Sequence, residues 1–159
     1  MDNLTQCYNR RKFDEIICEE KYLADTNNLP ISIMLIDIDD FKKVNDKFGH
    51  KVEDIVLQQI STCMKDNLRE NDTIYRWGGE EFLILLPNTN HKECSKISKR
   101  LVDICNEIIT PAGRISMSIG YGEFSHYDID SLIIDVDKAL YKAKSRGKNQ
   151  SCSVNYDTD

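Results

Sequence analysis

The sequence lacks an uninterrupted apolar run long enough to span a membrane, and its first residues, MDNLTQCYNRR, lack the apolar core of a signal peptide. It also lacks an excess of positive charge, because its formal net charge is -6. Duplex nucleic acids are bound mainly through positive surfaces, so we expect no nucleic-acid partner and no membrane contact within this segment. The net charge does not exclude the binding of a small anionic ligand, because local basic residues or Mg²⁺ can override it.

The spacing of a zinc site is also missing. There is no CxxC pair, and no histidine stands at zinc-finger distance from the cysteines. The six cysteines are Cys7, Cys18, Cys63, Cys94, Cys105 and Cys152. An even number would permit disulfides, but nothing marks the chain as secreted. We therefore expect reduced, partly buried thiols in the cytosol.

Length and composition indicate one domain over residues 1–159, because 40% of these residues are hydrophobic and 30% are charged. Apolar spacing predicts helices at 9–24, 39–45, 50–68, 88–109 and 131–146, and strands at 31–38, 73–77, 82–86, 114–124 and 152–156. Ser131 is expected to cap the last helix and Gly147 to end it. Parallel crossovers plus one antiparallel hairpin predict a mixed sheet packed against helices.

The segment ISIMLIDI, at 31–38, is almost entirely apolar and predicts a central strand covered on both faces. It includes Asp37 near its end, and Asp39 and Asp40 follow it. Because side chains alternate along a strand, Asp37 and Asp39 are expected to point the same way. Ligands of open α/β sheets bind at this carboxyl end of the strands.

A second acidic pair lies in YRWGGEEFLILL, where Gly78 and Gly79 separate two strands and Glu80 and Glu81 follow. Glycine pairs favour hairpin turns, because they supply positive φ without a Cβ clash. If the hairpin pairs beside the central strand, Glu80 approaches Asp37. Two carboxylates with a backbone carbonyl then form a suitable shell for Mg²⁺. From spacing alone, this metal site and a solvated turn and loop without metal have equal weight.

Basic residues follow the acidic strand end and the last predicted helix. Lys42 and Lys43 belong to the first group, and Lys144, Arg146 and Lys148 to the second. Each alone is typical of a solvated charge or of a cation at a helix C-terminus. Beside a metal, they become candidate phosphate ligands.

The segment GGEEF at 78–82 resembles the GG(D/E)EF signature of the GGDEF-domain family of diguanylate cyclases. Further segments resemble family motifs in the family's order. They are DNLT at 2–5 with NRR at 9–11, IDIDDFKKVND at 36–46, FGHKVED at 48–54, SMSIG at 116–120, and ALYKAK at 139–144 with GKN at 147–149. The likeness covers nearly the whole chain.

The resemblance implies an α/β (α+β) fold of the palm-like nucleotidyl-cyclase type. A central mixed sheet of about five strands would be wrapped by helices, with GGEEF on an antiparallel hairpin. It also implies that two GTP molecules condense to cyclic di-GMP and two pyrophosphates. Each 3′-hydroxyl would attack the α-phosphate held by a facing domain, so a homodimer is needed at least transiently. Family members usually carry a sensor or receiver domain, so we expect an isolated catalytic domain of a longer, regulated bacterial protein in the cytoplasm.

The resemblance assigns catalytic roles to five residues. Asp37, the Ile38 carbonyl and Glu80 would hold Mg²⁺, with Mn²⁺ as the alternative. Glu80 would also take the proton of the 3′-hydroxyl, and Glu81 would help with a second metal. Lys42 would stabilise charge on the phosphates in the transition state.

The remaining substrate contacts follow from the same resemblance. The backbone N–H groups of Phe41 and Lys42 would cradle phosphate. The other substrate-binding residues are Lys144 and Lys148 at the terminal phosphates, and Asn45, His50 and Asp54 at the guanine. An acidic acceptor at the guanine edge would discriminate against adenine, which leaves it unpaired.

A second site is implied by Arg69-Glu70-Asn71-Asp72, an RxxD segment separated from Gly78 by five residues. In this family, that arrangement marks an inhibitory site for the product cyclic di-GMP. Arg69 would contact guanine and phosphate, Asp72 would accept from the guanine edge, and Arg100 would add a further arginine. A lone RxxD without this context is more typical of a surface ion pair.

Three residues depart from the family pattern. Glu53 replaces a glycine near the base pocket, where its charge would weaken GTP binding. Lys148 and Lys96 replace arginines and lose bidentate geometry. None of the three removes a metal ligand. An active cyclase is therefore favoured over a silent module that binds GTP or cyclic di-GMP, and a mixed cyclic dinucleotide is a third reading.

Overall fold

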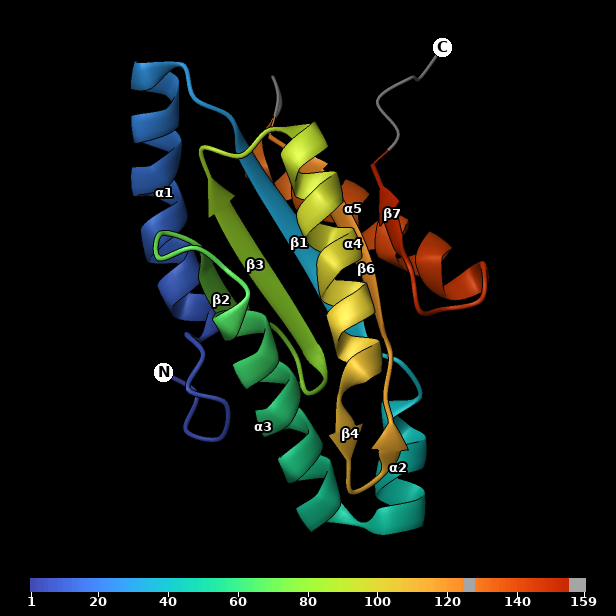
Figure 1. Ribbon diagram of the computed structural model, residues 1–159. Helices are drawn as coiled ribbons and strands as arrows, with labels where there is room; N and C mark the ends of the chain where they lie inside the picture. The colour runs from blue at the N-terminus through green and yellow to red at the C-terminus, as the bar shows by residue number, and fades with distance from the viewer. Residues whose placement is uncertain (125–127, 155–159) are drawn as a thin grey trace.

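The computed structural model of the chain describes residues 1–124 and 128–154, which form a five-stranded sheet with helices on both faces (Figure 1). The helices are α1 (Arg10–Asn27), α2 (Phe41–Phe48), α3 (His50–Asp66), α4 (His91–Glu107) and α5 (Ile129–Ser145). The strands of this sheet are β1 (Ile31–Ile38), β2 (Thr73–Arg76), β3 (Glu81–Pro87), β6 (Met117–Glu123) and β7 (Ser151–Ser153). The predicted fold class, a mixed sheet of about five strands wrapped by helices, is confirmed.

The strand order is β2-β3-β1-β6-β7, with β1 in the centre as predicted. β1 pairs antiparallel with both β3 and β6, and β6 with β7 is the parallel pair. The prediction of parallel crossovers around one antiparallel hairpin is therefore wrong for the strands that flank β1. On one side of β1 lies β3, the second strand of the hairpin, which is antiparallel to β1 (Figure 1). On the other side β6 is antiparallel as well.

Alternation along β1 explains why the segment reads as continuously apolar. Ile33 and Leu35 pack in a cluster with α1 and α5, whereas Ile36 and Ile38 pack in a cluster with α2, α3 and α4. Figure 1 shows the sheet between these two layers of helices. Both faces of the strand are thus withdrawn from water, and apolar burial on each side stabilises it.

Helix ends follow side-chain caps that the spacing of apolar residues did not reveal. α5 begins after Asp128, whose carboxylate accepts from the Ser131 N–H at 2.8 Å, so the prediction of Ser131 as the cap is wrong. α4 begins after Asn90, which forms a capping box with Glu93. Gly147, with φ +117°, follows the end of α5 as expected.

The predicted strand at 114–124 is two separate elements. β5 (Gly113–Arg114) pairs with β4 (Ile109–Thr110) in a small hairpin, and β6 begins only at Met117. Gly113 has φ +87°, a conformation that lets the chain turn tightly there. The predicted last strand is shortened to Ser151–Ser153, and positions 155 and 156 lie outside the described residues.

Two global features of the described residues bear on the expectations above. None of the helices in residues 1–124 and 128–154 is long and apolar enough to cross a membrane. All six cysteines are free, and four of them are buried, which confirms the expected thiols. Burial raises the pKa of Cys94 and of Cys105 to about 12, so these two thiols are held neutral inside the core.

Candidate active site

The hairpin lies beside the acidic end of β1. Glu81 is opposite Asp37 in the antiparallel register of β1 and β3. The N–H of Ile38 donates to the Glu80 carbonyl at 3.2 Å. The predicted approach of the GGEEF segment to the end of the central strand is therefore observed, and it follows from the β1–β3 pairing.

Lys144, on α5, is the cation that contacts both Asp37 and Asp39. Its Nζ lies 3.2 Å from Asp37 Oδ1 and 3.7 Å from Asp39 Oδ1. Asp37 and Asp39 therefore point the same way, as strand alternation predicts. Asp37 Oδ1 is buried, and this oxygen has no hydrogen-bond partner among the described residues, so the contact with Lys144 is an ion pair of imperfect geometry.

Three carboxyls in this region have raised pKa values. Burial raises the pKa of Asp37, and Lys144 partly opposes the shift. Burial and then the charge of Asp37 raise the pKa of Glu80, to which Glu81 and Glu53 add. Burial, Asp37 and Asp137 raise the pKa of Glu81. Lys144, Lys148 and Arg10 oppose these shifts without cancelling them, so the region holds more negative charge than its cations balance.

Such an arrangement fits a bound divalent cation. Among residues 1–124 and 128–154, no three acidic, histidine or cysteine side chains form a ready-made metal cage. Mg²⁺ seldom needs one, because it is usually held by one or two carboxylates together with water and substrate phosphates. The buried Oδ1 of Asp37, whose charged neighbour is the Lys144 ammonium at 3.2 Å, is an oxygen that such a cation would bind well.

The raised pKa of Glu81 has a consequence for stability. The folded protein holds this proton more tightly than the unfolded chain, so the ionised carboxylate opposes folding once the pH exceeds its raised pKa. We expect Glu81→Gln to increase the unfolding free energy at about pH 7 by a few tenths to about 1 kcal/mol, since solvent screens part of the effect. The gain should vanish as the pH falls through the raised pKa to about pH 4.

Urea unfolding at both pH values measures this difference. Glu70→Gln, which changes an exposed glutamate in the turn between α3 and β2, outside any helix terminus, is the matched control and should alter neither curve. A loss of stability for Glu81→Gln at neutral pH would contradict the account of crowded charge.

The predicted phosphate-binding residues lie around the start of α2. The N-cap of α2 is Asp40, which makes no side-chain hydrogen bond to the helix, so no cap covers the first-turn N–H groups. Lys42 is exposed on this first turn. Lys148 Nζ lies 2.6 Å from Asp40 Oδ1, and Lys43 Nζ lies 3.6 Å from the same oxygen. Lys148 is thus paired with a carboxylate beside the site.

The three residues predicted at the guanine lie together at the corner between α2 and α3. Asn45 is half-buried, and its carbonyl accepts from Gly49 N–H at 2.8 Å. His50 and Asp54 are exposed in the first turns of α3. His50 Nδ1 lies 3.6 Å from Glu53 Oε1. The acid that replaces the family's glycine is therefore part of this corner.

The turn of the hairpin differs from the expected geometry. Gly78 and Gly79 do not have positive φ, so the explanation of the glycine pair by backbone freedom is wrong. A Cβ on Gly79 would meet no atom within 4 Å, and one on Gly78 would lie 3.1 Å from Glu81 Oε2. What the pair provides is an uncovered backbone next to the carboxylates.

Sequence reasoning missed Arg76, which braces this turn. Its guanidinium donates to the Gly79 carbonyl at 2.7 Å and to both oxygens of Asp2 at 3.2 Å. Asp2 also accepts from the N–H and hydroxyl of Thr5. The DNLT segment is therefore joined to the GGEEF turn. Both the DNLT and the GGEEF motifs were visible in the sequence, but nothing in it indicated that they are in contact.

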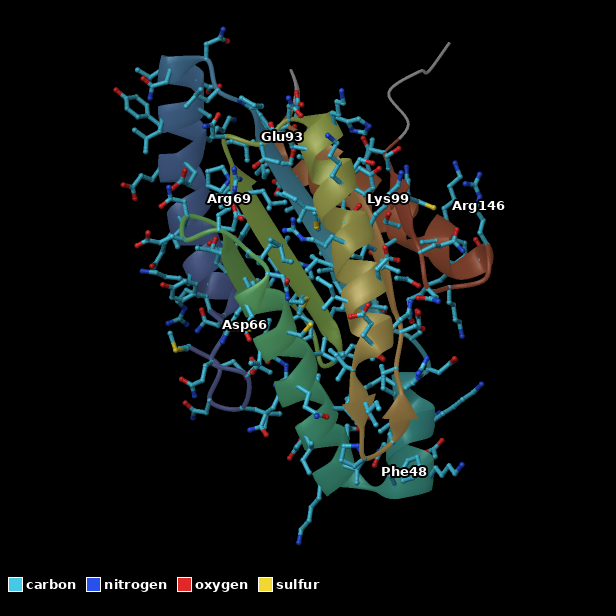
Figure 2. All side chains as sticks on the ribbon, in the orientation of Figure 1. Phe48, Asp66, Arg69, Glu93, Lys99 and Arg146 are labelled. Carbon is cyan, nitrogen blue, oxygen red and sulfur yellow. The ribbon has the colours of Figure 1, made fainter. Side chains whose placement is uncertain are left out.

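The arginine and the aspartate of the RxxD segment are bonded to each other. Arg69 donates to Asp72 through its backbone N–H, its Nε and one terminal nitrogen, at 2.9, 3.3 and 3.2 Å, and the Asp72 side chain is only 1% exposed. Arg69 also donates to the Pro87 carbonyl at 3.0 Å and to the Thr89 hydroxyl. The pair thus lies at the opposite end of β3 from Glu81. Figure 2 shows Arg69 far from Phe48, which ends α2.

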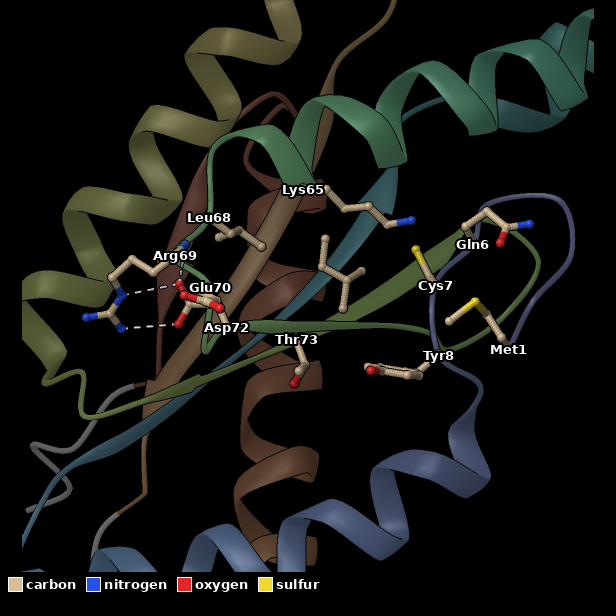
Figure 3. A pocket seen from close by; sticks show the side chains of 11 residues that line it. Met1, Gln6, Cys7, Tyr8, Lys65, Leu68, Arg69, Glu70, Asp72 and Thr73 are labelled. Atoms are coloured by element: carbon tan, nitrogen blue, oxygen red, sulfur yellow. Dashed lines mark hydrogen bonds and ion pairs between the residues drawn. The ribbon is translucent and has the colours of Figure 1, made fainter.

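Arg100 lies near the same segment, as predicted. It donates from α4 to the Asn67 carbonyl at 2.8 Å. A pocket of about 420 Å³ adjoins the RxxD segment on its other side (Figure 3). Figure 3 shows Gln6 and Cys7 across this pocket, with Arg69 turned away from them toward Asp72. Arg69, Asp72 and Arg100 are therefore close in the fold, but Asp72 is already satisfied.

Comparison with known proteins shows the family and the fold of the chain. The family model described as diguanylate cyclase, GGDEF domain, matches residues 1–150. Diguanylate cyclase DosC of Escherichia coli strain K12 is 36% identical over 156 residues, covering 94% of this chain and 34% of that protein. Diguanylate cyclase DgcZ of the same strain is 35% identical over 155 residues, covering 94% of this chain and 52% of that protein. The chain thus spans between a third and about half of these relatives.

A solved structure agrees in fold along nearly the whole chain. The active GGEEF domain of a diguanylate cyclase from Vibrio cholerae superposes with a TM-score of 0.89 at 31% identity, covering 94% of this chain and 99% of that one. The GGDEF domain of DgcB from Caulobacter crescentus, solved with c-di-GMP, gives a TM-score of 0.93 at 24% identity, which shows the fold alone. On the family match and on these likenesses, this chain belongs to the GGDEF family of diguanylate cyclase domains.

Proposed function

We propose that the chain condenses two GTP molecules to cyclic di-GMP and two pyrophosphates, with its catalytic centre at the end of β1. One observation supports this most. Asp37, Glu80 and Glu81 come together from two separate segments with raised pKa values and with Lys144 as their close cation. Carboxylates that Lys144 balances only in part, beside an uncapped helix start, suit a metal-bound triphosphate.

Asp37, the Ile38 carbonyl and Glu80 would hold Mg²⁺ or Mn²⁺, with Glu81 near a second ion. Bound there, the cation would neutralise phosphate charge and polarise the attacking hydroxyl. The support comes from the donor set, which consists of hard oxygens, and from the buried Asp37 oxygen.

The chain's own groups supply the remaining chemistry. Glu80 takes the proton of the 3′-hydroxyl of one GTP. The 3′-oxygen then bonds to the α-phosphorus of the other GTP, and the bond between that phosphorus and the pyrophosphate oxygen breaks. Lys42, Lys144 and Lys148 carry positive charge to the phosphates, and the first N–H groups of α2, at Phe41 and Lys42, cradle them. Guanine is bound at the α2–α3 corner by Asn45, His50 and Asp54.

Each domain holds one GTP, so the reaction needs two domains facing each other as a homodimer, at least transiently. The free cysteines are consistent with our proposal that this takes place in the bacterial cytoplasm. We also propose that the segment works within a longer protein that carries the regulatory input, because it spans only part of its relatives.

Incubation with GTP and Mg²⁺, followed by mass identification of the products, tests the proposal. We expect one cyclic di-GMP for every two GTP consumed, and none after chelation of the metal. The absence of product at high protein concentration, together with retained nucleotide binding, would favour a silent module that binds GTP or cyclic di-GMP. Adding ATP to the mixture tests whether a mixed cyclic dinucleotide is formed. We expect none, because Asp54 as a guanine contact favours GTP over ATP.

For the second site, we propose that product binds at Arg69, Asp72 and Arg100 and inhibits turnover. Binding must then exchange the contacts that Arg69 makes with Asp72 and Pro87. We expect Arg69→Ala to relieve inhibition by added cyclic di-GMP without lowering the initial rate. The same change removes the guanidinium bonds to the buried Asp72 and leaves it only the backbone N–H of position 69, which should cost about 1–3 kcal/mol of stability.

Initial rates measured against added cyclic di-GMP give the answer. Lys99→Ala, which changes an exposed cation on the neighbouring helix α4, should keep the wild-type inhibition curve. An unchanged curve for Arg69→Ala would remove the product-site proposal while leaving the cyclase proposal untouched.

A further inference from the structure

Asp39 is a buried carboxylate for which the proposed mechanism has no role. Its side chain is 2% exposed. Oδ1 accepts from the Ser118 hydroxyl at 2.6 Å, and Oδ2 accepts from the Ser116 hydroxyl at 2.7 Å and from the Asn149 N–H at 3.0 Å. Asp39 therefore joins the end of β1 to the start of β6 and to the loop that follows α5. A buried charge with this many donors is fixed in orientation.

One of its neighbours is a proposed phosphate ligand. Lys144 Nζ lies 3.7 Å from Asp39 Oδ1 and 3.2 Å from Asp37 Oδ1, and in residues 1–124 and 128–154 these two are its ion pairs. Asp37 is the carboxylate that the proposed function assigns to the metal. Once Asp37 is engaged there, Asp39 is the partner that keeps Lys144 at the end of β1.

The other proposed phosphate ligand is placed through the backbone. Lys148 and Asn149 have φ values of +63° and +52°, in the left-handed region that side-chain-bearing residues adopt infrequently. The Lys148 N–H donates to the Ala143 carbonyl at 3.0 Å, and the Asn149 N–H donates to Asp39. These two bonds hold the strained pair in place, with Lys148 Nζ 2.6 Å from Asp40.

We propose that Asp39 is a positioning residue that holds Lys144 and Lys148 in the arrangement in which they receive the GTP triphosphate. The proposal rests on the proposed function and adds to it a residue that touches neither substrate nor metal. The direction of the change in nucleotide affinity on removing Asp39 distinguishes positioning from charge. Through charge alone, removing Asp39 would strengthen the binding of an anionic nucleotide. Through positioning, the same removal weakens binding, because Lys144 and the loop lose their anchor.

The test is titration calorimetry with 3′-deoxy-GTP and Mg²⁺, because this nucleotide lacks the attacking hydroxyl and cannot react. Asp39→Asn keeps the shape of the side chain and removes its charge. We expect it to bind the analogue about tenfold more weakly than the wild type. In a Lys144→Met background, the same substitution should have a much smaller effect, because its main target is already absent.

Ser98→Ala is the matched control. It removes a polar contact elsewhere in the fold, the bond from Ser98 to the hydroxyl of Ser151 in β7 at 3.1 Å, without touching Lys144 or Asp39. It should leave the affinity unchanged. Ser116→Ala deletes one donor to Asp39 with little risk to folding, and we expect it to weaken binding in the same direction as Asp39→Asn but less.

Unchanged or tighter binding by both Asp39→Asn and Ser116→Ala, or full additivity with Lys144→Met, would overturn the positioning role and leave the cyclase proposal intact. Failure of the wild type to bind 3′-deoxy-GTP would instead overturn the proposed function, and this inference with it.

Discussion

Glu80→Gln is expected to lower the rate of GTP conversion by at least about a hundredfold, because glutamine can neither take the proton of the 3′-hydroxyl nor offer a negative oxygen to a metal. The fold should stay intact. The ionised Glu80 lies in a region already crowded by Asp37 and Glu81, so a neutral side chain of the same shape relieves repulsion. The variant should therefore melt at or slightly above the temperature of the wild type.

Product formation measured by mass, together with a thermal melt, separates these two effects. Glu15→Gln, on an exposed part of α1, is the control and should keep both activity and melting temperature. Normal turnover by Glu80→Gln would show that the metal and base assignments are wrong. A collapsed melting curve would show instead that Glu80 serves the fold.

Gly120→Ala is expected to cost at least about 3 kcal/mol of stability, which lowers the melting temperature by roughly 10 °C in a chain of this length. A Cβ at this position would lie 2.3 Å from the Val136 carbonyl oxygen and 2.4 Å from the Leu140 N, both backbone atoms of α5. No side-chain rotation relieves such a contact. Helix α5 must move off β6, and it carries Lys144 with it.

Gly79→Ala is the matched control for this prediction. Its added Cβ meets no atom within 4 Å, so it should keep the wild-type melting temperature while obstructing the uncovered backbone beside Glu80. A wild-type melting temperature for Gly120→Ala would mean that α5 can shift at little cost. Circular dichroism melts of the two variants decide this directly.

Much of the fold could be predicted because its evidence is local. The run from Ile31 to Ile38 has no polar face, so it had to lie between two layers. The five helices and their approximate positions followed from apolar spacing in the same way. Segments whose order depends on pairing were harder. β4 and β5, each two residues long, gave no periodic signal, and the strand direction around β1 depended on which hairpin strand lies beside it.

In the candidate site, too, local features could be predicted and long-range contacts could not. Asp37 and the glutamate pair were visible as unusual charges beside apolar strands, and their approach required only that the hairpin pair with β1. Arg76 was not visible, since its bond to Asp2 spans 74 positions. Asp39 was seen as an acid near the site, but its bonds to Ser116, Ser118 and Asn149 join segments 77 to 110 positions apart. Nothing in local composition encodes such contacts.

The sequence by itself determined the family of this chain, its layered α/β core and the residue types gathered at the end of the central strand, because motifs and apolar periodicity are properties of short segments. Only the tertiary structure decided which charges neutralise one another. It pairs Lys144 with two aspartates, Lys148 with Asp40 and Arg69 with Asp72. The physical reason is that an ion pair depends on the distance between two groups in space, and the chain sets that distance only when the sheet and helices have assembled.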